Sequence, residues 1–248
     1  MTESEPAAEL AALPWTQLPE RPLVLIPLGS LEQHGPHLPL DTDTAVASAV
    51  AHGTATRLRR RLPSAHVQVA PPIVYAASGE HQSFPGTMSI GTEALRFVLV
   101  ELVRSVALWS GRIVFVNAHG GNHGCLSGAV GQLVEEGRDV AWVPCEPEGG
   151  DAHAGHTETS LMLHLAPDRV DMTRAAKGNT APLGALLPSI LAGGIAAVSP
   201  SGVLGDPTTA TASEGARLLA ALVADVAGRI AYGRADARGR LLPAGVRA

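Results

Sequence analysis

The sequence predicts an α/β protein in which a mostly parallel sheet is covered by helices on both faces. Short apolar runs of strand length alternate along the 248 residues with longer segments of helical periodicity. This alternation favours a parallel sheet, because each helix carries the chain back across one face to the next strand. Apolar residues make up 46% of the chain and charged residues 17%, which indicates a globular protein and excludes a disordered one.

The predicted elements follow one another in a regular order after a proline-containing lead-in at residues 1–20. No repeat and no change of composition marks a boundary after it, so we expect residues 21–248 to form a single domain. The predicted strands are residues 23–28, 66–70, 112–117 and 139–143. The predicted helices are residues 44–61 (with Thr42 or Asp43 as the N-cap), 92–109, a helix from the NAHGGNHG motif to about 136, 157–165 and 213–234, and residues 168–200 have a mixed pattern.

Charge, cysteine content and hydropathy indicate which partners and which compartment to expect. The formal net charge is -5, and the basic cluster at residues 57–61 is interpreted as the solvated end of a helix, so no nucleic-acid partner is expected. Cys125 and Cys145 match no zinc motif and are expected to be reduced thiols. The start of the chain lacks a signal pattern, and no apolar run reaches the ~20 residues of a membrane helix. We therefore expect a cytoplasmic protein that does not bind membranes.

Ionisable side chains gather where the predicted strands end. Glu32, His34 and Asp43 follow the first strand, His119 follows the third, and Glu158 follows the fourth. In parallel sheets these strand ends lie at one edge, where ligands bind. Imidazole and carboxylate groups suit Zn²⁺, Mn²⁺ or Fe²⁺, and five of them with one bridging carboxylate are enough for two ions. The spacing thus predicts a metal site with one or two ions, although Glu158 could instead be a carboxylate that stabilises a helix N-terminus.

Four stretches resemble the motifs of the creatininase family of metal-dependent amidohydrolases. GSLEQHGPHLPLDTD is similar to the family's long signature, NAHGGN and AGHTETSLML to its second and third motifs, and FPGT to a fourth. The resemblance covers roughly residues 20–200. It implies a three-layer α/β/α fold, a homo-oligomer and two divalent ions per subunit, Zn²⁺ with Fe²⁺ or Mn²⁺. It also implies that Glu32, His34, Asp43 and His119 are ligands, with Asp43 bridging the ions.

The chain departs from creatininase proper at two places. Creatininase proper has a glutamate ligand two residues after the histidine of the second motif, and this sequence has Gly121 there. We expect Glu158 to supply the missing carboxylate. Creatininase proper also covers its small ring substrate with tryptophan from a loop, whereas the corresponding stretch CEPEGGDAHAGH has no aromatic residue. Creatinine is therefore not the expected substrate.

Within the family, the stretches DAHAGHTETSLMLHLAPDRVDM and AVSPSGVLGDPTTATASEG resemble a peptidase branch. This resemblance implies release of a modified C-terminal Val-Tyr dipeptide from a precursor peptide during redox-cofactor biosynthesis. We expect His153 to act as the general acid, with His156 as the alternative. The predicted substrate-binding residues are Ser78, Glu80, His81, Asn122 and Asp151. Two other functions stay open: a formamide or lactam hydrolase of the same fold, and a non-enzymatic metal-binding scaffold.

Overall fold

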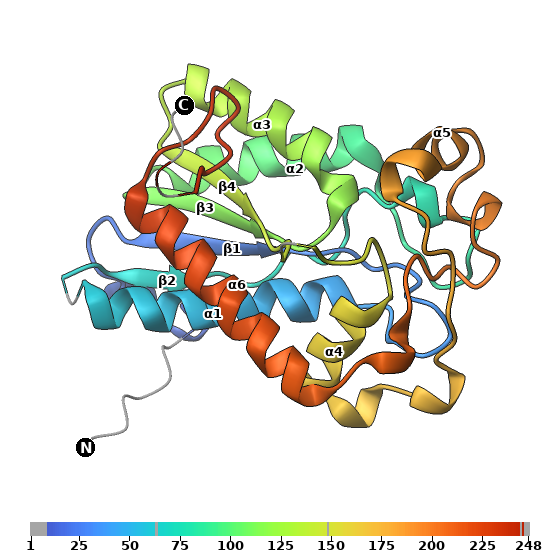
Figure 1. Ribbon diagram of the computed structural model, residues 1–248. Helices are drawn as coiled ribbons and strands as arrows, with labels where there is room; N and C mark the ends of the chain where they lie inside the picture. The colour runs from blue at the N-terminus through green and yellow to red at the C-terminus, as the bar shows by residue number, and fades with distance from the viewer. Residues whose placement is uncertain (1–8, 63, 148, 244, 246–248) are drawn as a thin grey trace.

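A parallel sheet of four strands in the order β2–β1–β3–β4 forms the centre of the molecule (Figure 1). The computed structural model describes residues 9–62, 64–147, 149–243 and 245. The strands are β1 (Leu23–Leu28), β2 (Val67–Val69), β3 (Arg112–Asn117) and β4 (Val140–Pro144). The predicted strands and their parallel pairing are thus confirmed, with differences of one residue at the ends of β2 and β4.

Helices cover both faces of this sheet and make a three-layer α/β/α fold (Figure 1). The helices are α1 (Thr42–Arg61), α2 (Gly91–Val106), α3 (His123–Glu135), α4 (His156–Leu165), α5 (Leu183–Gly193) and α6 (Ala212–Tyr232). The short 3-10 helices are η1 (Leu10–Ala12), η2 (Trp15–Gln17), η3 (Gly79–His81), η4 (Gly120–Asn122), η5 (Pro167–Arg169), η6 (Met172–Arg174), η7 (Ile195–Ala197) and η8 (Pro207–Thr209). The predicted fold class is confirmed.

The two faces of the sheet have separate apolar cores because successive side chains of a strand point to opposite sides. Leu25 of β1 packs with α1 and α6, whereas Val24 and Ile26 pack with α2 and α3. On β3, Val114 and Phe115 divide in the same way. The central strands are therefore buried on both faces, which fixes the positions of the loops that follow them.

Two regions differ from the sequence prediction. Helix α1 begins at Thr42 with Asp41 as its N-cap residue, so neither Thr42 nor Asp43 is the cap. Asp43 instead lies buried in the first turn of the helix. The segment of mixed pattern contains α5, whose internal Pro188 and flanking glycines obscure its helical period.

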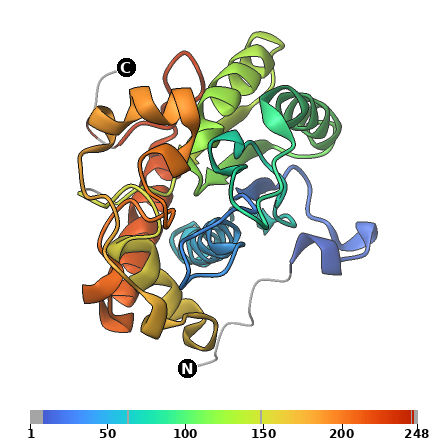
Figure 2. The same cartoon turned by 90° about the vertical axis from the view of Figure 1, so that its right-hand side faces the viewer.

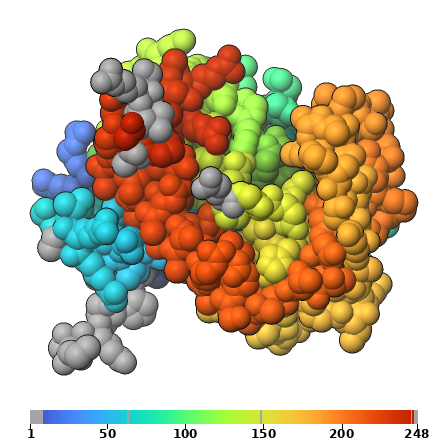
Figure 3. All heavy atoms as spheres, in the orientation of Figure 1, coloured from blue at the N-terminus to red at the C-terminus, as the bar shows by residue number. Residues whose placement is uncertain are grey.

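Helices α4 and α5 and the loops after the strands gather on the carboxyl side of the sheet, which Figure 2 shows facing the reader. Helix α6 runs as an orange-red band across the face shown in Figure 3, so one of its sides faces solvent. Among the described residues, no helix combines the length and the apolar character that a membrane span requires.

Candidate metal centre

The structure brings the five predicted ligands together at the carboxyl ends of β1, β3 and β4. Nε2 of His34 lies 3.0 Å from Oδ1 of Asp43 and 3.9 Å from Oε2 of Glu158. Nδ1 of His119 lies 3.3 Å from Oε1 of Glu32 and 3.3 Å from Oδ2 of Asp43. The two oxygens of Asp43 thus face two different histidines, as a bridging carboxylate would.

Within the described part of the chain, the donor atoms form three sets that could each hold a cation, one of which, Glu32 with His81 and His153, shares Glu32 and His153 with the other two. Glu32, Asp43 and His119 form the first half of the centre, and one ligand atom from each lies within 4.8 Å of the others. His34, His153 and Glu158 meet the same criterion and form the second half. Both halves combine imidazole nitrogen and carboxylate oxygen, which suits a transition metal such as Zn²⁺ or Mn²⁺.

Unpaired oxygen atoms inside the cluster indicate that these residues fit a metal. Both carboxylate oxygens of Glu32 and Oδ2 of Asp43 are buried and accept no hydrogen bond within the part of the chain that the structure describes. A buried carboxylate without a partner is costly, and coordination to a cation relieves that cost. The donor set and its unpaired oxygens therefore match the divalent ions that the family resemblance implies.

The charges of the cluster shift the pKa values of its members strongly. Burial alone would lower the pKa of His34, but the carboxylates of Asp43, Glu158 and Glu32 raise it to about 10. Burial likewise opposes the charged form of His119, and the Glu32 and Asp43 carboxylates raise its pKa well above the usual value. Burial raises the pKa of Glu158 to about 7 against the lowering effect of His34. The carboxylates thus require positive charge beside them, from imidazolium or from metal.

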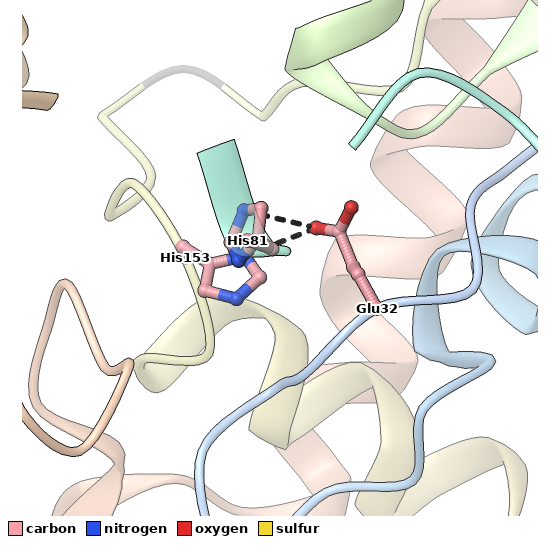
Figure 4. A group of neighbouring side chains, drawn as sticks. All are labelled: Glu32, His81 and His153. Carbon is pink, nitrogen blue, oxygen red and sulfur yellow. Dashed lines mark ion pairs between the residues drawn. The ribbon is translucent and has the colours of Figure 1, made fainter. Parts of the chain in front are cut away.

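His153 lies inside the cluster, as Figure 4 shows beside Glu32 and His81. Its backbone pairs with Leu204 in a short antiparallel bridge, and its buried ring lies 4.4 Å from the ring centroids of both His34 and His81. Nδ1 of His153 is 3.8 Å from Oε1 of Glu32. The predicted general acid therefore lies next to the predicted ligands, although its role stays a prediction.

His156 points away from the cluster, so the structure does not support it as the alternative proton donor. Its Nδ1 lies within hydrogen-bond distance, 2.9 Å, of the hydroxyl of Thr209. His156 and Glu158 are two positions apart on α4, which places their side chains about 200° apart around the helix axis. Since Glu158 faces the cluster, His156 necessarily faces the opposite side.

Asp151, a predicted substrate-binding residue, caps the start of α4. Its Oδ1 accepts a hydrogen bond from the amide of Thr157 at 3.0 Å, and its Oδ2 accepts one from the amide of His156. A side chain at Gly155 or Gly205 would overlap this carboxylate, so both glycines make room for the cap. Both oxygens thus hold the start of α4, and a role of Asp151 in binding substrate stays a prediction.

Asn122 and Ser78 also have internal partners. The amide of Asn122 donates to the carbonyl of Gly29 and to Oδ1 of Asn117, both at 3.0 Å, and accepts from the amide of Ala77 at 3.3 Å. The hydroxyl of Ser78 pairs with that of Ser30. Both predicted substrate-binding residues are buried and join the loops to one another, and their role toward a substrate stays a prediction.

Known proteins resemble this chain in sequence and in fold, in agreement with the geometry of the centre. The sequence model of a family described as creatinine amidohydrolase matches residues 11–230. The chain belongs to the creatininase family. It is 60% identical over 226 residues to "Mycofactocin precursor peptide peptidase" of Mycobacterium ulcerans, and the match covers 90% of each chain.

Solved structures of creatininase share the fold. One described as "Creatininase Mn" superposes with a TM-score of 0.75 at 26% identity, covering 92% of this chain and 100% of that one. Another, a mutant creatininase described as "Zn-Zn type", gives a TM-score of 0.74 at 25% identity, covering 92% and 99%. Members of the creatininase family are thus known with both metals that the donor set suits.

Glu80 occupies the place where this member of the creatininase family lacks a side chain. Its carboxylate comes from η3, is 28% exposed, and lies 3.4 Å from Nε2 of His119. A side chain at Gly121 would overlap both Oε1 of Glu80 and Nε2 of His119. The sequence alone shows that position 121 lacks a carboxylate. It does not show that Glu80, 41 positions earlier, fills the space beside His119, because only the fold brings the two together.

Two residues of the first loop were given no role by sequence reasoning. Gln33 is buried and lies within hydrogen-bond distance of both His81 and His153. Nε2 of His37 lies 2.8 Å from the hydroxyl of Thr159 and so joins this loop to α4. Their position inside the creatininase signature, between and beside predicted ligands, was the available signal.

Proposed function

We propose that this chain is the metal-dependent peptidase that releases a modified C-terminal Val-Tyr dipeptide from the mycofactocin precursor peptide. The observation that carries the proposal is the 60% identity, over 90% of both chains, to the Mycobacterium ulcerans peptidase. The buried cluster of imidazoles and carboxylates at the sheet edge is consistent with a hydrolase of amide bonds. The identity of the dipeptide rests on the resemblance of residues 151–172 and 197–215 to the peptidase branch of the family.

The two halves of the centre would each hold one divalent ion, Zn²⁺ together with Fe²⁺ or Mn²⁺. Glu32 and His119 would bind one ion, His34 and Glu158 the other, and Asp43 both, because its two oxygens face His119 and His34. When bound, such a pair activates water and polarises the carbonyl oxygen of the scissile amide.

His153 has the position needed to move a proton to the leaving amine. Its ring is held by the Leu204 bridge and packed between the rings of His34 and His81, so that Nδ1 lies 3.8 Å from Glu32. Burial and the neighbouring histidines hold the pKa of His153 well below its usual value. A neutral ring of this kind can accept a proton during the attack of water and then pass it to the amine as the amide bond breaks.

The substrate specificity follows from what surrounds the cluster. The loop between β4 and α4 has no aromatic side chain that could stack on a small ring. Glu80 and His81 of η3 lie at the same edge, and the partly exposed Glu80 could accept a hydrogen bond from a peptide amide. This surface is consistent with an extended peptide.

We also propose that the protein is a homo-oligomer in the cytoplasm. Large apolar side chains on the surface support an assembly, since Phe97 of α2 and Leu191 of α5 are 69% and 85% exposed. Light scattering on the purified protein gives the test, and a monomer at micromolar concentration contradicts the assembly.

The decisive experiment is mass spectrometry of the modified precursor peptide after incubation with the metal-loaded protein. We expect a fragment with the mass of the modified Val-Tyr pair and a precursor shortened by that mass. The His153→Ala variant serves as the control for contaminating peptidases. An intact precursor together with hydrolysis of a small formamide or lactam assigns the chain to the second type of amidohydrolase. Retained metal without any hydrolysis indicates the scaffold.

A further inference from the structure

Gln33 has a side-chain amide whose orientation is fixed by the backbone on both sides. Its Oε1 accepts a hydrogen bond from the amide of Gly35 at 2.8 Å, and its Nε2 donates to the carbonyl of Gly202 at 3.2 Å. A flipped amide would place oxygen against oxygen and N–H against N–H. Gly202 is required there, because its φ of +81° is left-handed and a side chain would overlap the Gln33 amide.

This orientation determines which nitrogen of His81 carries the proton. Nε2 of Gln33 lies 2.8 Å from Nδ1 of His81, and an amide nitrogen only donates. Nδ1 of His81 therefore accepts, and the neutral ring must carry its proton on Nε2. That Nε2 lies 3.2 Å from Oε1 of Glu32, on the side of the cluster (Figure 4).

Gln33 also determines which nitrogen of His153 carries the proton, and here the nitrogen that faces the site is an acceptor. The two hydrogens of the Gln33 amide are used by His81 and Gly202, so Nε2 of His153 does not accept one. Nε2 of His153 instead lies 2.9 Å from the backbone carbonyl of Gln33, which only accepts. The proton of His153 is therefore on Nε2, and its lone pair is on Nδ1, which points to Glu32 at 3.8 Å.

We propose that Gln33 is a positioning residue that fixes two different tautomeric faces at the metal centre: an N–H from His81 and a lone pair from His153. His81 then cannot bind a cation through Nε2, and the N–H of this nitrogen lies beside the Glu32 carboxylate. His153 can bind or accept a proton at Nδ1. Its catalytic meaning rests on the proposed function, but the tautomers themselves do not.

Nitrogen NMR of histidine-labelled, zinc-loaded protein tests this assignment without any substrate. In the wild type we expect long-range proton couplings that place the hydrogen on Nε2 in both His81 and His153. In Gln33→Glu the carboxylate accepts only, so the hydrogen of His81 moves to Nδ1. His153 keeps its hydrogen on Nε2, because the backbone carbonyl at position 33 is unchanged.

The matched control is Gln82→Glu, which makes the same change at an exposed residue next to His81. It leaves both tautomers unaltered. Gln33→Met removes the donor without adding charge, keeps the test available if Gln33→Glu does not fold, and gives His81 a mixture of tautomers. We expect it to lower kcat by about 10–100-fold with little change in KM, as for other residues that orient a metal site.

A hydrogen on Nδ1 of His81 in the wild type overturns the proposal, and so does an unchanged His81 in both folded Gln33 variants. Failure to cleave the precursor peptide, with the expected tautomers present, contradicts only the proposed substrate.

Discussion

The two halves of the metal centre are held by different means. Every residue of the first half, Glu32, Asp43 and His119, is buried and follows a central strand or begins the helix behind it. In the second half, the buried His34 follows the central strand β1, but His153 and Glu158 come from the segment after the edge strand β4, and the Glu158 side chain is 21% exposed. The sheet thus fixes the first half and His34, whereas loop packing fixes His153 and Glu158.

The segment between β4 and α4, which carries His153, is held by local backbone and side-chain hydrogen bonds. The left-handed backbone of Ala154, with a φ of 51°, directs its amide to Oε2 of Glu158 at 2.5 Å. Asp151 caps α4, and Leu204 holds His153 from the other side. A left-handed alanine costs about 1 kcal/mol, so this region stores strain that the central loops lack. We expect changes in the first half to abolish metal binding and changes in the second half to alter rate, affinity or stability in steps.

The largest effect is expected for Asp43→Ala, because this carboxylate faces both halves. The variant should retain neither ion after purification and dialysis, as measured by elemental analysis, while circular dichroism shows an unchanged helix content. Asp41→Ala is the control: Asp41 lies two residues earlier in an exposed ion pair with Arg169, which contributes little, and its loss leaves both ions bound. Unchanged two-metal content in Asp43→Ala contradicts the bridging assignment.

The next effect is expected for His153→Ala in the second half. Removing the proposed general acid should lower kcat by about 10²–10⁴-fold while both ions remain bound. His156→Ala, three residues further on and hydrogen-bonded to Thr209, is the control and should keep nearly normal activity. Loss of an ion from His153→Ala identifies His153 as a ligand, and a normal rate assigns the proton transfer elsewhere.

The residues after β1 follow from the sequence more directly than those after β4, for a physical reason. Glu32 and Asp43 of the first half and His34 of the second belong to one contiguous motif after an apolar strand, so periodicity and strand order place them together. The orientations of Asp151 and His156 do not follow from the sequence, because they depend on the helix cap and on the rotation of α4. Neither the phase of a short helix nor the amide orientation of Gln33 can be read from residue types alone.

A smaller effect on the first half is expected for Glu80→Gln. The Glu80 carboxylate lies 3.4 Å from Nε2 of His119, opposite the nitrogen that faces Glu32. A carboxylate behind a metal-binding histidine increases its basicity, and its removal typically lowers metal affinity by about 10–100-fold. Competition with a chelator measures this change, and Glu135→Gln at an exposed position of α3 is the control. If metal affinity is unchanged and only KM rises, Glu80 binds substrate instead.

The smallest effect is expected for Asp151→Ala, which tests how the second half is held. The variant leaves two amides at the start of α4 without their acceptor, and loss of such a cap costs about 1 kcal/mol of unfolding free energy. Urea denaturation of the metal-free protein measures this loss, and Asp151→Asn should recover part of it because one acceptor oxygen remains. Metal bound by the first half should be unaffected, since Glu32, Asp43 and His119 do not depend on this helix. If Asp151→Ala instead lowers the metal content of both halves, the two halves form one cooperative unit. The conclusion that the sheet and the loop hold them independently is then wrong.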